Sequence, residues 1–381
     1  MSVFDLNGNA VSYCYDKSGT AITDVYDFAG HIHHPQYAPS TPYEQTLYSA
    51  MQDWQSKRAS SVVPLIVHAD QHTYLRNNNI FSKLSDMGAV SGISACLNLG
   101  DVTDYNVSNF QAMTQALSYI PKELQINLWG NHETWIRQVD MTPPYRTVAG
   151  AELSEINTYY DNSDYRTQHT YNDYGIQYLI DSTNKIKYVV LTGWEYDSQL
   201  GTYNYYVMGS QSMDYVISML STVDDYDVVI ISHIQPFYDL YSHTLWTHPP
   251  VEPETPQGGG GSMSTNVVCT ATNVHLDDLL NARKNKTSGT IADSYGNIHS
   301  FDFTSCTSDL LCCLAGHEHI DKYAWGNNGS IPVYIFDGYG FDNHPIYYLN
   351  IDKANKYLDV WKIDESPHCY NFRIPFTRPN T

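Results

Sequence analysis

Five short motifs combine aspartate, histidine and asparagine, the residue types that bind divalent metal ions through oxygen and nitrogen. They are Asp70-Gln-His72, Gly100-Asp101, Gly130-Asn131-His132-Glu133, His233 and Gly316-His317-Glu-His319. Carboxylate, imidazole and amide groups suit Mn, Fe, Zn or Mg, and availability decides among these ions. The sequence contains no Cys-x-x-Cys pair, so the motifs predict a metal site without thiolate ligands.

Each motif directly follows a run of apolar residues that is typical of a buried strand. The runs span residues 62–67, 95–99, 125–129, 228–231 and 310–315. Ligands of α/β sheets bind at the carboxyl ends of the strands, and side chains two residues apart on a strand face the same way. We therefore expect the motifs to converge in one crevice. Gly100, Gly130 and Gly316 are expected to allow sharp turns beside the metal ions.

Each motif has a simpler interpretation when it is taken alone. Asp70 and His72 fit an ordinary surface loop, residues 130–133 fit a turn, and His233 fits a core histidine with satisfied hydrogen bonds. The occurrence of all five motifs in order, each at the end of a predicted strand, favours one shared site over five unrelated loops.

This ordered series resembles the calcineurin-like metallophosphoesterase superfamily, whose motifs are Asp-x-His, Gly-Asp, Gly-Asn-His-Asp/Glu, a single His and Gly-His-x-His. The resemblance covers roughly residues 62–340. It implies a four-layer β-sandwich flanked by helices, whereas the periodicity of the sequence alone predicts only the α/β class.

The resemblance also implies two divalent metal ions, whose ligand sets share one residue. The first set comprises Asp70, His72, Asp101 and His319. The second set comprises Asp101, Asn131, His233 and His317. Asp101 then bridges the two ions. By the same resemblance, His132 is the catalytic residue that protonates the leaving oxygen or stabilises the transition state.

The implied function is hydrolysis of a phosphate ester by a hydroxide that bridges the two metal ions. We expect a phosphodiesterase ahead of a phosphomonoesterase. The alternative is a structural or adhesive virion protein that keeps the phosphoesterase domain as a scaffold or glycan binder. A nuclease is disfavoured, because the net charge is −21 and no basic groove interleaved with aromatic residues is visible.

The first thirty residues contain a repeat with a period of eleven. Phe4-Asp5, Tyr15-Asp16 and Tyr26-Asp27 each precede a glycine three residues after the aspartate. Asp-x-x-Gly favours tight turns, so we expect short strands joined by turns over residues 1–42, ending in a Pro-rich linker. Three such units are too small to bury a core alone. The segment is either an extension packed on the main domain or an attachment or oligomerisation module.

The flanking sequence resembles metallophosphoesterases encoded by phages and prophages of Gram-positive gut bacteria. This resemblance rests on residues 43–70, on residues 279–287 and on Asp302-Phe303. It implies that residues 1–42 dock on phage tail or baseplate proteins. It also implies a cell-surface substrate such as a teichoic acid phosphodiester.

Residues 43–381 are expected to form the metallophosphoesterase domain. Leu47, Met51 and Trp54 predict a helix over residues 43–58, and further helices are predicted over 108–119 and 212–222. Another buried strand is predicted at 187–191, and strand-like alternation returns from Val333 onward. The glycines and prolines at about 242–266 predict an excursion from the domain.

The sequence also bears on compartment. It has no apolar run as long as a transmembrane helix and no visible signal peptide, so we expect a virion-associated or cytoplasmic protein without membrane insertion. Seven sparse cysteines are typical of buried free thiols rather than a disulfide framework. An acidic protein that hydrolyses anionic phosphate esters needs cations in its site.

Overall fold

The computed structural model describes most of residues 37–376 and four short strands before them. The described residues are 14–15, 21–22, 25–26, 32–33, 37–72, 80–102, 113–134, 167–171, 176–191, 194–197, 202–205, 208–221, 225–236, 241–244, 276–317, 319, 321–325, 331–338, 345–365 and 367–376. Most of the predicted excursion at 242–266 lies outside these residues.

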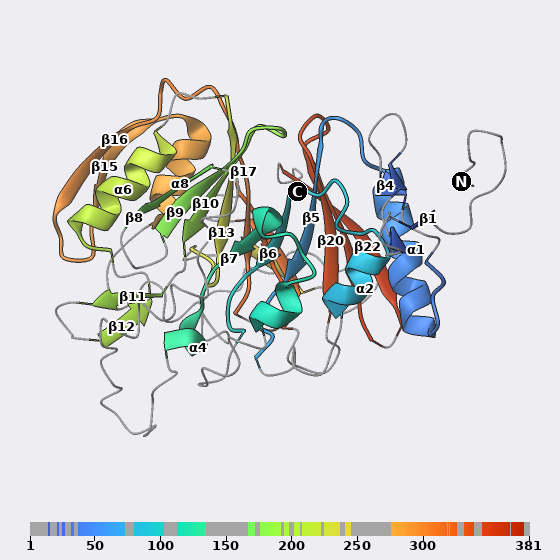
Figure 1. The fold of residues 1–381 in the computed structure, drawn as a ribbon. Coiled ribbons are helices and arrows are strands. Elements are labelled where there is room, and N and C mark those ends of the chain that lie inside the picture. The colour runs from blue at the N-terminus through green and yellow to red at the C-terminus, as the bar shows by residue number, and fades with distance from the viewer. Residues whose placement is uncertain are drawn as a thin grey trace.

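Two mixed sheets form the centre of the molecule (Figure 1). The first has six strands in the order β22–β21–β20–β5–β6–β7. Its strands are β5 (Val62–His68), β6 (Ala95–Asn98), β7 (Gln125–Asn127), β20 (Ile346–Asp352), β21 (Tyr357–Ile363) and β22 (Cys369–Pro375). The strands β5, β6 and β7 are parallel, and β20 joins them antiparallel to β5.

The second sheet has eight strands in the order β14–β18–β19–β17–β13–β10–β9–β8. Its strands are β8 (Thr167–Tyr171), β9 (Ile176–Asp181), β10 (Ile186–Leu191), β13 (Asp227–Ser232), β14 (Tyr241–Thr244), β17 (Leu310–Ala315), β18 (Lys322–Trp325) and β19 (Pro332–Ile335). The central strands β10, β13, β17 and β19 run parallel. All six strands predicted from apolar runs are therefore present.

The two sheets pack face to face on a shared apolar core. Alternate residues of β5, such as Leu65 and Val67, belong to the same buried cluster as Val229 and Ile231 of β13. The intervening residues of these strands face outward into a second core beneath the helices, as Ile66 and Ile230 do. Because both faces are buried, these strands are continuously apolar rather than alternating.

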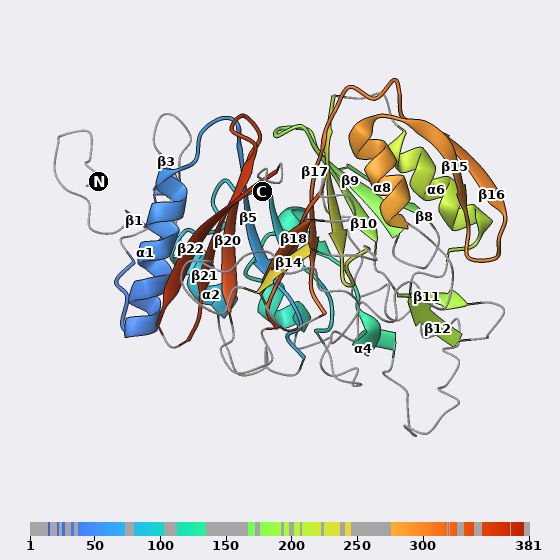
Figure 2. The same cartoon turned by 180° about the vertical axis from the view of Figure 1, so that it is seen from behind.

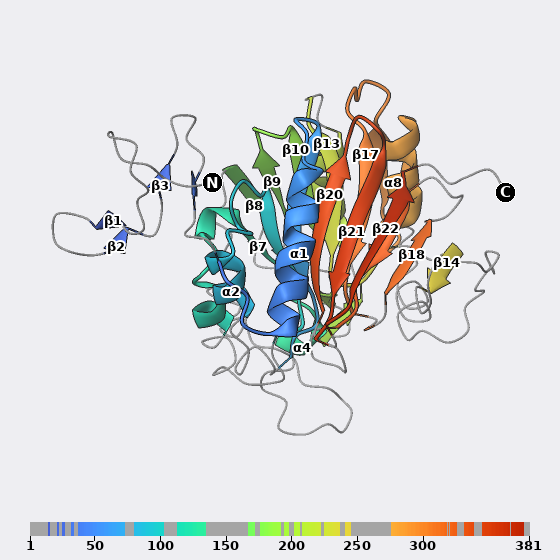
Figure 3. The ribbon, with the colours of Figure 1, turned by 90° about the vertical axis from the view of Figure 1, so that its right-hand side faces the viewer.

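Helices cover the outer faces of the sheets (Figures 2 and 3). The helices are α1 (Pro42–Ser56), α2 (Ile80–Asp86), α6 (Ser210–Leu220) and α8 (Leu276–Asn285). Thr41 caps α1 by accepting a hydrogen bond from the Glu44 amide, and Trp54 stacks on Tyr348 of β20 at 4.7 Å. The arrangement is helix, sheet, sheet, helix, and the predicted helices at 43–58 and 212–222 are confirmed. Of the predicted helix at 108–119, residues 113–119 are described; residues 113–117 are helical, and residues 118–119 form a turn.

The smaller elements lie outside the two main sheets. Two strand pairs near the N-terminus are β1 (Cys14–Tyr15) with β2 (Ala21–Ile22), and β3 (Val25–Tyr26) with β4 (Ile32–His33). Each pair flanks one of the predicted Asp-x-x-Gly turns. Two further hairpins are β11 (Trp194–Asp197) with β12 (Thr202–Tyr205), and β15 (Ser288–Ala292) with β16 (Ile298–Asp302). A short 3-10 turn, η2 (Lys122–Leu124), precedes β7.

Five described cysteines are free thiols, as predicted for this protein. Four of them are buried and Cys369 is exposed. No helix in the described part of the chain is long and apolar enough to cross a membrane.

Candidate metal centre

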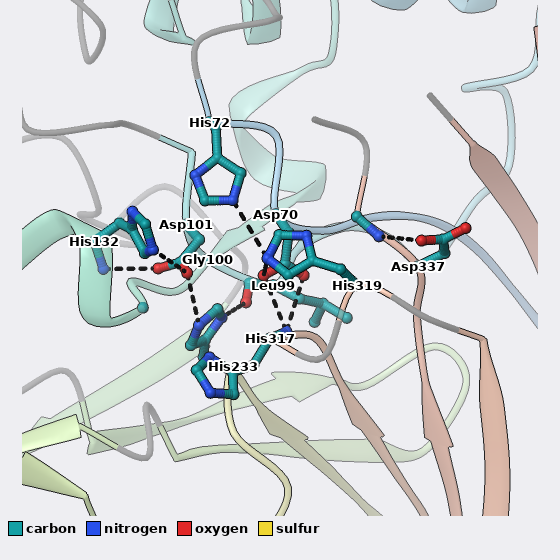
Figure 4. A network of polar contacts seen from close by, with 12 residues as sticks. Asp70, His72, Leu99, Gly100, Asp101, His132, His233, His317, His319 and Asp337 are labelled. Atoms are coloured by element: carbon teal, nitrogen blue, oxygen red, sulfur yellow. Dashed lines mark hydrogen bonds and ion pairs between the residues drawn. The ribbon is translucent and has the colours of Figure 1, made fainter. Parts of the chain in front are cut away.

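The predicted site residues follow parallel strands of both sheets. Asp70 and His72 follow β5, and Asp101 follows β6. His132 lies in α4 (Asn131–Thr134), shortly after β7. His233 follows β13, and the pair His317 and His319 follows β17. These side chains point toward one another from both sheets (Figure 4).

Three groups of these side chains place one ligand atom of each member within 4.8 Å of the others. The groups are Asp70 with His72 and His319, Asp101 with His233 and His317, and His72 with Asp101 and His132. The structure therefore brings together six of the seven predicted metal ligands and the predicted catalytic histidine. Asn131 begins α4, but its side chain lies outside the described part of the structure.

The first group is organised around the fully buried carboxylate of Asp70. Its two oxygens accept hydrogen bonds from the His317 amide at 3.0 and 2.9 Å. Nε2 of His319 lies 3.7 Å from Asp70 Oδ1 and 3.4 Å from Nε2 of His72. Two imidazole nitrogens and a carboxylate oxygen thus face one point, which is the geometry of a metal position.

The second group is organised around Asp101, which is also fully buried. His233 meets the Leu99 carbonyl through Nδ1 at 2.7 Å, which directs its Nε2 toward Asp101 Oδ2 at 3.2 Å. His317 packs edge to face against His233 at 5.1 Å. A carbonyl behind the ring fixes which imidazole nitrogen is available to a metal ion.

The backbone of the site is held in an unusual conformation. Asp70, His72, Asp101, His317 and His319 all have positive φ, between 47° and 75°. The other non-glycine residues with positive φ in the described chain are three lysines, Lys185, Lys286 and Lys356. A positive φ costs free energy in a non-glycine residue. This conformation persists where the surrounding structure enforces it, typically at functional sites.

The glycines act differently from the sequence prediction. Gly100 has φ +94°, as expected for a turn, but no positive φ is found at Gly130 or Gly316. Their role is close approach: a Cβ on Gly130 would lie 2.2 Å from Asp101 Oδ1 and 2.6 Å from His233 Nε2. The missing side chain leaves room for the ligands themselves.

The surroundings of the Asp101 carboxylate show that these residues suit divalent cations. Asp101 Oδ2 is buried and accepts no hydrogen bond within the described structure. It faces ring nitrogens of His233 and His132, at 3.2 and 3.7 Å. Two buried aspartates and the imidazole nitrogens around them form a donor set that suits Mn, Fe or Zn.

No protein-family model and no curated protein matches the sequence. Among solved structures, the chain is similar to Vps29 from Chaetomium thermophilum, with 8% identity, a TM-score of 0.24, and coverage of 84% of this chain and 97% of that chain. It is also similar to a serine/threonine phosphatase from Saccharomyces cerevisiae with similarity to human phosphatase PP5. There the identity is 11% and the TM-score 0.26, with coverage of 90% and 92%. TM-scores this low do not assign the chain to a family.

Glu133 was not singled out as a site residue from the sequence. Its buried carboxylate accepts hydrogen bonds from three backbone amides, those of Asp101 (3.0 Å), Val102 (2.7 Å) and Gly130 (2.6 Å). It thereby ties the loop after β6 to the loop after β7. The signal for it in the sequence was its place as the last residue of the Gly-Asn-His-Glu motif.

We expect Glu133→Ala to lower the free energy of unfolding by about 3 kcal/mol, because three buried amides lose a charged acceptor. Chemical denaturation with urea measures this loss. The exposed Glu123→Ala is the control and should leave the midpoint unchanged. Equal stability of the two variants would contradict the role assigned to Glu133.

The two aspartates of the site differ in their proton affinity. Burial raises the pKa of Asp70 to about 7, although the imidazole of His233 opposes the rise. At Asp101, burial is outweighed by the imidazoles of His233 and His132, which hold its pKa below its usual range. The same contact outweighs the burial of His233 and raises the pKa of that imidazole to about 9. In the metal-free protein, Asp101 and His233 therefore form an ion pair.

Two other histidines of the site, His317 and His319, are neutral at pH 7. Burial lowers the pKa of His317 to about 3 and that of His319 to about 4, with neighbouring imidazoles adding to the effect. Neutral imidazole is the form that binds metal ions, so these two residues hold no proton that a cation must displace at pH 7.

Metal binding is therefore expected to release protons. At pH 7, His233 holds a proton because its pKa of about 9 lies above the solution pH, and a bound cation must displace it. We expect release of about one proton from His233, and less as the pH rises through 9. Calorimetric titration with Mn²⁺ in PIPES and in Tris gives the proton count from the difference in enthalpy. His233→Asn should remove about one proton from that count, and equal enthalpies in both buffers at pH 7 would contradict the ion pair.

Proposed function

We propose that this protein is a metal-dependent phosphoesterase with two divalent cations in its site. The observation that carries the proposal is the position of Asp101. Its buried carboxylate belongs to one group with His233 and His317 and to another with His72 and His132. A carboxylate that is shared between two pairs of histidines is the arrangement that a binuclear metal centre needs.

The chain's own residues have separable tasks in this reaction. Asp70, His72 and His319 would hold one cation, while Asp101, His233 and His317 would hold the other. Asp101 also groups with His72, a member of the first set, and with His132. When bound, the cations would supply positive charge for the phosphoryl oxygens and lower the pKa of a water molecule.

His132 is placed to handle the leaving group. Its amide donates to Asp101 Oδ1 at 2.8 Å, which fixes the start of α4 against the site. Its side chain is 20% exposed, whereas that of His233 is fully buried. A histidine that borders the metal ligands and still reaches solvent is suited to donate a proton to a departing alkoxide.

Charge also supports cation-assisted chemistry. With a net charge of −21, the protein repels phosphate esters at long range. Two of the acidic residues, Asp70 and Asp101, lie in the site itself, so substrate binding requires cations to reverse the local sign. We expect a chelator to abolish substrate binding and turnover together.

The finer parts of the prediction remain proposals. We propose membership of the calcineurin-like superfamily on the order of the five motifs and their convergence, and we favour phosphodiesters over monoesters as substrates. Docking of residues 1–42 on a phage tail or baseplate also remains a proposal. Its support is that the pairs β1–β2 and β3–β4 have strands of only two residues, which are too small to bury a core.

The deciding experiment compares bis-p-nitrophenyl phosphate with p-nitrophenyl phosphate in the presence of Mn²⁺. Turnover of either ester that is lost with a chelator and restored by Mn²⁺ supports the proposed function. A higher kcat/KM for the diester supports the phosphodiesterase. If protein loaded with two Mn²⁺ ions turns over neither ester, the proposed function is wrong and a structural or adhesive role takes its place.

A further inference from the structure

Behind His319 lies a buried charged cluster that the five motifs do not include. It consists of Lys362 on β21, Asp321 just before β18 and Asp337 just after β19. Nζ of Lys362 contacts Asp321 Oδ2 and lies 2.9 Å from Asp337 Oδ2. Their side chains are 14%, 6% and 19% exposed, respectively. Lysine and aspartate are rarely buried to this extent unless they are paired.

Two tyrosines complete the cluster. The hydroxyls of Tyr347 and Tyr334 donate to Asp321 Oδ1 at 2.7 and 3.1 Å. The amide of Asp337 donates to the Tyr347 hydroxyl at 3.0 Å. Tyr347 is also the direct neighbour of Lys362 across β20 and β21. Side chains of the six-stranded sheet thus fix the loops that leave β17 and β19 of the eight-stranded sheet.

The cluster reaches His319 through Gly338. Asp337 Oδ1 accepts a hydrogen bond from the Gly338 amide at 2.9 Å (Figure 4). A Cβ on Gly338 would lie 2.2 Å from His319 Nδ1 and 3.1 Å from its Cγ and Cε1. The backbone of Gly338 therefore forms a wall against one side of the imidazole. The opposite nitrogen, Nε2, faces Asp70 and His72.

We propose that Lys362, Asp321 and Asp337 are positioning residues that fix the ring of His319 and set the metal affinity of the Asp70–His72–His319 position. Lys362 holds two carboxylates together that would otherwise repel each other. The held Asp337 fixes Gly338, and Gly338 fixes the ring. Partners behind a metal ligand commonly change metal affinity by 10- to 100-fold. Only the part of this inference that concerns metal affinity rests on the proposed function.

The effect should be confined to one of two cations. In the described structure, the cluster contacts the wall behind His319, whereas His233 is oriented by the Leu99 carbonyl. A general loss of stability would weaken both positions alike. Selective weakening is therefore the signature of positioning.

The test uses Lys362→Met, with Lys362→Arg as the conservative variant. Lys353→Met is the matched control, because Lys353 also joins the two sheets by contacting Asp227 at 3.0 Å. Asp227 begins β13, whereas the site residue His233 follows the other end of that strand. Calorimetric titration with Mn²⁺ should show one of two affinities lowered about tenfold in Lys362→Met and largely restored in Lys362→Arg. Lys353→Met should bind both ions as the wild type does. In a His317→Gln background, which keeps the Asp70–His72–His319 position, the loss should persist.

A second measurement does not need metal. In the metal-free protein, the ring nitrogens of His319 are observed by two-dimensional NMR and assigned by their absence in His319→Gln. We expect these signals to shift or broaden in Lys362→Met and to stay unchanged in Lys353→Met. Asp337→Asn keeps the oxygen that accepts the Gly338 amide and should shift the His319 signals less than Lys362→Met does. It replaces Lys362→Met in this measurement if that variant does not fold.

The outcomes separate the two proposals. If the wild type binds no Mn²⁺, the proposed function fails, and the ring signals still decide the role of the cluster. If both Mn²⁺ affinities fall equally, or if the His319 signals are unchanged in Lys362→Met and Asp337→Asn, the positioning role is overturned.

Discussion

Asp101→Asn is expected to abolish binding of both divalent cations and to lower kcat/KM by on the order of 10³-fold or more. Asparagine keeps the oxygen that accepts the His132 amide at 2.8 Å, so the loop after β7 retains its anchor. What is lost is the negative charge that pairs with His233 and faces both groups of histidines. Loss of this one negative charge is therefore expected to prevent binding of both cations.

Metal content after dialysis against Mn²⁺, measured by mass spectrometry, checks this prediction. Asp359→Asn is the matched control, because Asp359 is also buried but pairs with Arg373 at the surface of β21. It should retain both ions and full turnover. Two bound ions in Asp101→Asn would end the bridging role of this carboxylate.

His132→Ala is expected to lower kcat for a phenyl or alkyl ester by about 10² to 10⁴-fold while the protein keeps both cations. The reason is that His132 borders Asp101 and His72 but remains partly exposed, as a proton donor to substrate must be. If the residue donates a proton, the loss depends on the leaving group. It should be small for p-nitrophenol, which departs readily as an anion, and large for a phenyl or alkyl ester.

The measurement is kcat for a p-nitrophenyl and a phenyl ester in wild type and variant, together with metal content. His368→Ala, at a histidine whose side chain is 62% exposed, is the control and should match the wild type. Loss of a cation from His132→Ala would make His132 a ligand, as its grouping with His72 and Asp101 also permits. An equal loss for both esters would argue for stabilisation of the transition state instead of proton donation.

The strands and their order along the chain are predictable here because the signal is local. Buried strands such as β5 and β13 are apolar along most of their length, and polar motifs begin where they end. The division into two sheets is not local. Whether β20 pairs with β5 or joins the other sheet depends on contacts across almost 300 residues, as in the pairing of Ile351 with Val63. Only the family resemblance anticipated a layered sandwich.

The site shows the same division. Residue types and spacing predict the candidate ligands, because imidazoles and carboxylates that recur at successive strand ends are typical of a metal site. Left-handed φ at Asp70 or His319 was not predictable, because these residue types do not favour it strongly enough to reveal it. The cluster around Lys362 was invisible for another reason: it forms only when the register of β20 and β21 places that lysine beside Tyr347.

The position of β5 has a consequence for how the chain is made. β5 lies inside the six-stranded sheet, between β6 and β20, and β20 to β22 come from residues 346–375. During synthesis, β5, β6 and β7 emerge long before the strand that covers the edge of β5. The backbone groups along that edge stay open for pairing with other chains until residues 346–352 leave the ribosome. Shortening the chain before β20 should therefore lower its solubility more than it disturbs local structure, although every predicted metal ligand would still be encoded.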